Sequence, residues 1–200
     1  MQNVACNFFR PHLVTMRSKY LIPTILLLFF SQKVLADSPP CWCKFDVKSK
    51  NSKFIATVDR VKEDSLKEPW NARWILTITR DSAGKGIIWT TLYKYSGYPD
   101  GQLSDDGIYF VYVEGWFYKD VPLIKIYKKG AQIDTKTLTG DSFKIPKSKL
   151  RKSVSHELWI SDKGVWGFQS LNGQSVFAIT TVDNKRHFIN LDKGNFFRTG

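Results

Sequence analysis

Residues 103–113 read LSDDGIYFVYV, a polar turn that leads into a run of aromatic and β-branched residues. Residues 160–166 read ISDKGVW and repeat the order of that turn, since its Ser, Asp and Gly recur 57 positions later. We expect Gly107 and Gly164 to occupy equivalent turns, each with a positive φ that glycine tolerates, before a strand enters the core. The pattern predicts a fold of repeated strand units, with a third copy beginning near Asn51.

Elsewhere after residue 36, apolar and polar side chains alternate, which is typical of half-buried strands. Only residues 63–68 and 145–152 are expected to form short helical turns. The sequence therefore predicts an all-β domain, an antiparallel meander of three-stranded blade-like units forming a partial propeller or an irregular sandwich or barrel. The predicted strands are Phe54–Val58, Trp74–Thr79, Ile87–Leu92, Ile108–Val113, Leu123–Tyr127, His156–Ile160, Val165–Phe168, Val176–Thr181 and His187–Leu191.

The segment LSDDGIYFVYV is similar to the S-x-D-G edge of β-propeller blades in bacterial secreted proteins. Residues 179–194, ITTVDNKRHFINLDKG, resemble the inner strands and closing turn of such a blade. The span from about residue 100 to 195 thus resembles a group of uncharacterised bacterial exported proteins with propeller-like repeats. This resemblance implies export and repeated sheets, but it does not imply any biochemical activity. Closed propellers have at least about four blades, so three units predict an open arrangement or part of an assembly.

The first 36 residues have the order of a secretory signal peptide. They hold four basic residues and no acidic one, an apolar run over residues 20–30, and Val34-Leu35-Ala36 before Asp37. We expect cleavage after Ala36, with Met16 as an alternative start, and a single β-rich domain over residues 37–200. The alternative is an uncleaved anchor, but the run is shorter than the roughly 20 residues of a spanning helix. The mature chain is therefore expected to be secreted or periplasmic and not integral to a membrane.

The chain has 30 Lys and Arg against 18 Asp and Glu, a formal net charge of +12. Without the four basic residues of the leader the balance is 26 against 18, or +8. A basic surface of this kind favours an anionic glycan, a lipid surface or an envelope protein, and export argues against nucleic acid. The alternative is a solvated charged loop. The predicted binding residues are Lys144, Lys147, Lys149, Arg151 and Lys152, with the aromatic Trp116, Tyr118 and Trp159.

Cys41 and Cys43 form a C-W-C motif, which lacks the spacing of a thioredoxin-like or zinc-ribbon motif. A local disulfide would need a tight bend, because two such side chains lie on one face of an extended strand. Three interpretations remain open: an oxidised pair, within the chain or between chains; a reduced, structurally idle pair; or a soft-metal site. We expect no metal and no cofactor.

The sequence contains no nucleophile elbow and no phosphate-binding glycine loop. His156 is the residue best suited to acid–base chemistry, with Asp105 or Asp162 as its carboxylate partner. The Asp105-Asp106 pair is explained by a turn as well as by calcium binding. We therefore favour a binding or structural protein of the bacterial envelope, and an exported hydrolytic enzyme that uses His156 is the alternative.

Overall fold

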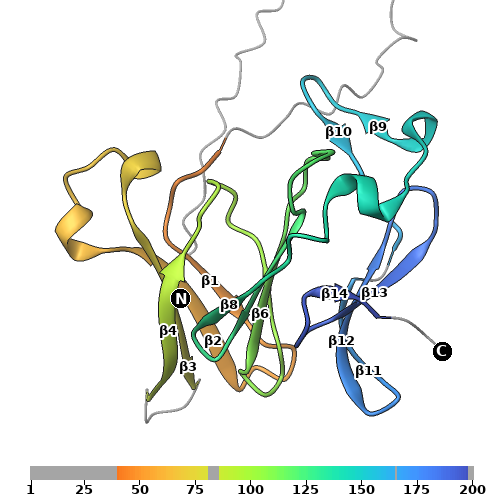
Figure 1. Cartoon of the computed structure of the whole chain (residues 1–200). Coiled ribbons are helices and arrows are strands. Elements are labelled where there is room, and N and C mark those ends of the chain that lie inside the picture. Colours follow the sequence, from red (N-terminus) through yellow and green to blue (C-terminus); the bar gives the residue numbers. More distant parts are fainter. Residues whose placement is uncertain (1–39, 81–85, 165, 198–200) are drawn as a thin grey trace, which may run out of the picture. The chain divides into compact units, whose positions relative to one another are not determined.

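The computed structural model describes residues 40–80, 86–164 and 166–197. The predicted signal peptide, the alternative start at Met16 and the cleavage site before Asp37 lie outside the described residues. The same holds for the predicted turn at residues 81–85 and for Val165. Within the described part, the fold is all-β and antiparallel, with no α-helix (Figure 1).

The first sheet is a meander of β1 (Phe45–Lys48), β2 (Phe54–Arg60), β3 (Trp74–Arg80) and β4 (Ile87–Tyr93), each paired with the next in the chain. Alternate residues of β2 and β3 are buried, as their sequences predict. A register shift between Ile78 and Thr79 marks an irregularity in the pairing of β3 with β4. One face of this sheet is therefore apolar and available for packing.

The middle sheet consists of β5 (Gln102–Leu103), β6 (Tyr109–Val113), β7 (Ile124–Lys128) and β8 (Ala131–Ile133), again in chain order. All five residues of β6 are buried. Successive side chains on a strand point to opposite faces, so burial of the whole strand requires cover on both faces. This sheet accordingly lies between the other two large sheets.

The third sheet contains β11 (Gly167–Leu171), β12 (Gln174–Thr180), β13 (Arg186–Asn190) and β14 (Asn195–Phe196). Between the middle and third sheets, the chain forms a two-stranded hairpin of β9 (Arg151–Lys152) and β10 (Glu157–Leu158). The two segments expected to be helical contain only short 3₁₀ turns, η2 (Lys62–Asp64) and η5 (Lys147–Lys149). Two further 3₁₀ turns are η3 (Pro69–Asn71) and η4 (Gly140–Phe143).

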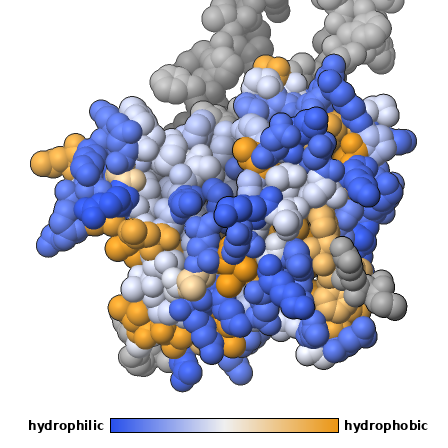
Figure 2. Space-filling model, viewed as in Figure 1, coloured by the Kyte–Doolittle hydropathy of each residue, from blue (hydrophilic) through white to orange (hydrophobic). Residues whose placement is uncertain are grey.

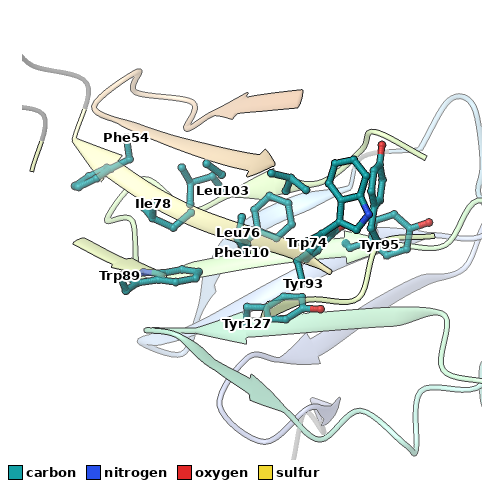
Figure 3. Close-up of a cluster of buried hydrophobic side chains, with 13 residues drawn as sticks. Phe54, Trp74, Leu76, Ile78, Trp89, Tyr93, Tyr95, Leu103, Phe110 and Tyr127 are labelled. Carbon is teal, nitrogen blue, oxygen red and sulfur yellow. The ribbon is translucent and has the colours of Figure 1, made fainter. Parts of the chain in front are cut away.

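Two hydrophobic cores fill the spaces on either side of the middle sheet. In the first core, Trp74 and Leu76 of the first sheet meet Phe110 and Tyr127 of the middle sheet (Figure 3). In the second core, Val111 of β6 packs with residues of the third sheet. The buried members of that core are Tyr109, Val111, Val113, Leu123, Ile124, Ile126, Leu138, Phe143, Trp159, Phe177, Ile179, Ile189 and Leu191.

The large sheets hold four strands each, so the expectation of three-stranded units is wrong. The sequence did not predict the short strands β1, β5, β8 and β14, which are two to four residues long. The four sheets remain separate in the described residues, without closure into a propeller or barrel.

The two S-D-x-G segments both form turns, but they are not equivalent. Gly107 donates to the Ser104 carbonyl oxygen at 3.0 Å and Gly164 to that of Ser161 at 3.2 Å. Gly107 has φ +70°, whereas Gly164 is not among the residues with positive φ, contrary to our expectation. A Cβ at Gly164 would lie 2.4 Å from Cβ of Thr180, so close packing explains this glycine.

The two S-D-x-G segments also differ in their strand pairing. Leu103 pairs with Phe110 across its own turn, within the middle sheet. Ile160, which occupies the corresponding position 57 residues later, forms a bridge with Thr181 of the third sheet instead. The similarity is therefore one of local turn sequence, and it does not place the following strands at the same position in their sheets.

Candidate functional site

The first strands of the three large sheets converge on one cleft of about 580 Å³. β1, β5 and β11 each begin a meander, and each contributes side chains to the walls. The cleft is lined by Val47, Lys48, Lys50, Gly101, Gln102, Leu103, Asp105, Trp166, Gly167, Phe168 and Gln169. We call it the first-strand cleft.

The wall formed by β11 is fixed by two packing relationships. Trp166 and Phe168 set their rings nearly perpendicular to that of Phe177, at interplanar angles of 80° and 82°. Gln102 of β5 donates from Nε2 to the Trp166 carbonyl oxygen at 3.3 Å, which joins the middle and third sheets across the cleft. Gly167 has φ +149°, and a Cβ there would lie 3.0 Å from Oε1 of Gln102. Glycine therefore allows the two sheets to approach closely.

A neighbouring hollow of about 430 Å³ extends the cleft toward β12. The two share Asp105, Phe168 and Gln169, and the hollow adds the hydroxyl groups of Ser170 and Ser175. Together they offer aromatic rings, amides, hydroxyls and the two ammonium groups of Lys48 and Lys50. A groove of this composition can bind a polar ligand that also has apolar faces.

Both carboxylates of the Asp105-Asp106 pair are held by local hydrogen bonds. Asp105 accepts from the backbone N–H of Asn51 at 2.7 Å, and its carbonyl oxygen accepts from the Asn51 amide at 2.8 Å. Asp106 accepts from the hydroxyl of Ser104 at 2.6 Å and from the N–H of Ile108 at 2.9 Å. These bonds stabilise the turn and connect it to the β1–β2 connection. They agree with the prediction that the Asp105-Asp106 pair forms a turn.

Four of the predicted site residues meet at a second place, the hollow beside the β9–β10 hairpin. Tyr118, Lys152 and His156 line this space of about 470 Å³. The His156 imidazole stacks on the Trp116 indole with ring centroids 4.5 Å apart. The bridge between Trp116 and Leu158 holds the two segments together. Sequence reasoning therefore identified residues that the fold gathers, although it did not identify the first-strand cleft.

His156 and the carboxylates proposed as its partners lie in different segments of the chain. Asp105 precedes β6, whereas Trp116, on which His156 stacks, follows β6, so the five-residue strand separates them. Asp162 forms an ion pair with Arg151 at the base of the β9–β10 hairpin, and His156 lies at the tip. This bond from Arg151 lowers the pKa of the Asp162 carboxyl group.

The predicted basic run extends from the end of η4 through η5 into β9. Lys144 ends η4 in a left-handed conformation, and Lys147 and Lys149 lie in η5. Arg151 is neutralised by Asp162, while Lys152 lines the β9–β10 hollow. Hydrophilic side chains cover much of the visible surface over this hairpin (Figure 2).

Trp159 is a core residue, in contrast to its predicted binding role. It is fully buried, packs on Phe143 with centroids 4.7 Å apart, and donates from Nε1 to the Glu114 carbonyl oxygen at 2.6 Å. His187 packs on Phe143 and Phe196, and burial lowers its pKa. Both side chains therefore serve packing.

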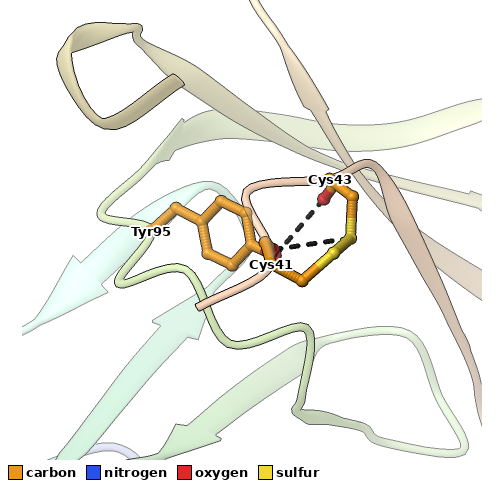
Figure 4. The surroundings of a disulfide bond; sticks show 3 residues. All are labelled: Cys41, Cys43 and Tyr95. Atoms are coloured by element: carbon orange, nitrogen blue, oxygen red, sulfur yellow. Dashed lines mark hydrogen bonds between the residues drawn. A yellow bond between two sulfur atoms is a disulfide. The ribbon is translucent and has the colours of Figure 1, made fainter. Parts of the chain in front are cut away.

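Cys41 and Cys43 form an intrachain disulfide, one of the alternatives left open by the sequence. The expected tight bend is present, since Cys43 N–H donates to the Cys41 carbonyl oxygen at 2.8 Å. The hydroxyl of Tyr95 donates to the same oxygen at 2.7 Å (Figure 4).

Sequence reasoning missed Lys48, Gln102, Trp166 and Phe168 as site residues. Each lies on or beside the first strand of a sheet, and only the arrangement of the sheets brings them together. The sequence predicts that Trp166 and Phe168 lie in a strand. The local alternation of residues does not predict that their rings line a cleft between sheets.

Among the described residues, no group of three or more His, Cys, Asp or Glu side chains is placed to hold a metal ion. In the same part of the chain, no helix has the length and apolar character needed to span a bilayer. Comparison with protein-family models, with curated proteins and with solved structures gives no match to this chain.

Proposed function

We propose that the chain is an exported binding protein of the bacterial envelope that holds an anionic glycan in the first-strand cleft. The observation that carries the proposal is the convergence of β1, β5 and β11 on one space that combines aromatic rings with amides and ammonium groups. Such a lining suits a sugar, whose C–H faces pack on aromatic rings and whose hydroxyls need donors and acceptors.

Charge supports an acidic rather than a neutral glycan. The cleft holds the ammonium groups of Lys48 and Lys50 against the single carboxylate of Asp105. The Asp105 carboxylate is already bonded to Asn51. The expected mature chain also has an excess of basic residues, 26 against 18 acidic ones. Both features favour uronate or phosphate-bearing sugars.

We also propose that the three large sheets are the blades of an open, partial propeller. In a propeller, blades stand around an axis and their first strands line the central channel. Three consecutive four-stranded meanders whose first strands share a cleft are consistent with an open, partial propeller. The cleft would then correspond to the channel, which is where such folds offer a ligand site. His156 stacks on Trp116 and Asp162 pairs with Arg151, and neither contact favours the hydrolytic alternative over glycan binding.

Affinity for polygalacturonate, measured by calorimetry with neutral pullulan as the comparison, tests the proposal. Trp166→Ala should weaken binding by about tenfold, since a buried aromatic contact is lost. Lys50→Gln changes an exposed side chain and should reduce the preference for the acidic polymer without affecting folding. Trp116→Ala, which removes an aromatic ring outside the cleft, is the matched control. Equal affinity of the Trp166→Ala and unmodified proteins, or no binding to either polymer, would refute the proposal.

A further inference from the structure

The Cys41–Cys43 disulfide closes a very short loop, with one residue between the two cysteines. A disulfide stabilises a fold mainly by restricting the unfolded chain, and this effect grows with the length of the closed loop. A bond across one residue therefore restricts the unfolded chain far less than an ordinary structural disulfide. Its presence calls for another role.

The backbone around the pair is held in place without the sulfur–sulfur bond. Tyr95 donates to the carbonyl oxygen of Cys41 at 2.7 Å and lies 3.3 Å from that of Cys43 (Figure 4). Burial raises the pKa of Tyr95 to about 12, so its hydroxyl remains a donor over the physiological range. The Trp42 ring packs edge-on against Tyr95 at 5.4 Å. The two Cα atoms, 5.4 Å apart, would thus stay close after reduction.

A close glycine contact completes this anchor. A Cβ at Gly97 would lie 2.7 Å from Cβ of Pro40 and 2.9 Å from the Trp42 ring. The absence of a side chain at Gly97 therefore lets the segment that carries both cysteines settle against the aromatic cluster. Cys41 itself is exposed, and Cys43 is half-buried. An incoming thiolate can therefore reach the Cys41 sulfur more easily.

We propose that Cys41 and Cys43 are a reversible redox couple that passes its disulfide to a protein or peptide with two thiols. Fixed, adjacent and accessible sulfurs in a small ring are the features of exchangeable disulfides, whereas structural ones resist the glutathione pool. This activity is independent of glycan binding, because the pair and the first-strand cleft share no residue.

The exchange proceeds in two balanced steps. A substrate thiolate attacks the Cys41 sulfur, the bond between Cys41 and Cys43 breaks, and its electron pair leaves on the Cys43 sulfur, which takes up a proton. The second substrate thiolate then attacks the substrate sulfur of the mixed disulfide and releases Cys41, which also takes up a proton. The substrate loses two electrons and two protons to form its disulfide, and the pair gains them.

Thiol counting tests this proposal. The protein is equilibrated in glutathione buffer at cytosolic poise, then alkylated, and modified peptides containing residues 41 and 43 are identified by mass. We expect most of the pair to be reduced under these conditions, with an unchanged far-ultraviolet circular dichroism spectrum. A pair that stays oxidised, or a fold that is lost on reduction, would overturn the proposal.

Transfer itself is measured by mixing the oxidised protein with a reduced peptide that contains two cysteines. Oxidised peptide and reduced Cys41/Cys43 should appear in equal amounts. Asp120→Asn, at an exposed position outside the anchor, keeps both sulfurs and should retain transfer, whereas the double variant Cys41→Ser/Cys43→Ser should lose it. Peptide oxidation that is as fast with the double variant would show that the pair is not responsible. Glycan binding in the same variants should not change, which separates this test from that of the proposed function.

Discussion

The hydroxyl of Tyr109 donates a 2.7 Å hydrogen bond to Oδ1 of Asp192, and this bond connects the middle sheet to the β13–β14 turn of the third. Lys128 adds an ion pair to the same carboxylate at 2.6 Å. The Lys128 ammonium also lies 5.6 Å from the centre of the Tyr109 ring. Tyr109 and Lys128, which are paired across β6 and β7, thereby hold a carboxylate of the third sheet's last turn against the middle sheet.

Replacing Tyr109 with Phe removes this hydrogen bond and preserves the aromatic packing. The expected loss in the free energy of unfolding is about 1 kcal/mol, the usual contribution of such a bond. Urea unfolding of the two proteins measures the difference. Tyr118→Phe, at an exposed phenol, is the control and should have little effect. Equal stability of Tyr109→Phe and the unmodified protein would show that the bond contributes nothing.

The buried Asp64 carboxylate should make stability depend on acid pH. The side chain of Arg73, then that of Lys67, then the Arg73 backbone N–H bond to Asp64 and lower the pKa of its carboxyl group far below the ordinary range. A folded-state pKa below the unfolded value stabilises the protein above about pH 4, and this stabilisation is lost as the pH falls toward the folded value.

Asp64→Asn should therefore lower the thermal midpoint at neutral pH and flatten its decline below about pH 4. Thermal unfolding monitored by circular dichroism over a range of pH values tests this expectation. The exposed Asp120→Asn variant is the control and should reproduce the unmodified profile. An acid profile of Asp64→Asn as steep as that of the unmodified protein would contradict the role of Asp64.

Gly107 and Gly173 allow backbone strain to be separated from crowding. Both have positive φ, +70° and +73°, but a Cβ at Gly107 would lie 2.7 Å from the Phe54 ring, whereas at Gly173 it meets open space. Gly173→Ala should cost about 1–2 kcal/mol of stability for the backbone alone. Gly107→Ala should cost more because the ring must also move. Equal losses in chemical unfolding would mean that Phe54 accommodates the methyl group.

Lys147 and Lys149 test the predicted attraction to anionic surfaces. They lie together in η5, and replacing both with Gln should lower the salt concentration that elutes the protein from a heparin column. Lys53→Gln/Lys62→Gln removes the same charge from exposed positions in the β1–β2 connection and in η2. If both double variants elute at the same salt concentration, net charge explains retention and the basic run has no special role.

The proposed export predicts a defined mature end. The intact mass of protein recovered outside the cytoplasm should correspond to a chain that begins at Asp37, because Val34 and Ala36 provide the small residues before the cleavage site. An Ala36→Asp variant, with a charged side chain at that position, should accumulate as the longer form. Recovery of unmodified protein that still carries residues 20–30 would contradict cleavage.

The central strands β2 and β3 of the first sheet could be predicted because their burial follows the alternation of the sequence. β2 and β3 extend over Phe54–Arg60 and Trp74–Arg80, within two residues of the expected ends. β1 and β5 were missed because four and two residues are too few to show a period. These two strands form walls of the first-strand cleft, so the cleft could not be predicted either.

The burial of individual aromatic residues could not be predicted from the local sequence either. Trp159 and Trp116 were both predicted to be binding residues, yet the Glu114 carbonyl oxygen accepts the N–H of Trp159 and allows its complete burial. Trp116 instead lies beside a surface hollow, where it stacks on His156. The two differ in a tertiary partner that no local pattern contains.

The burial of β6 on both faces has a consequence for cooperativity. Phe110 belongs to one core and Val111 to the other, so adjacent residues of one strand support both. Opening either core would expose a face of the same strand and remove support from the other core. The two cores should therefore melt in one transition, and the amide hydrogens of β6 should exchange with solvent only when the whole domain unfolds.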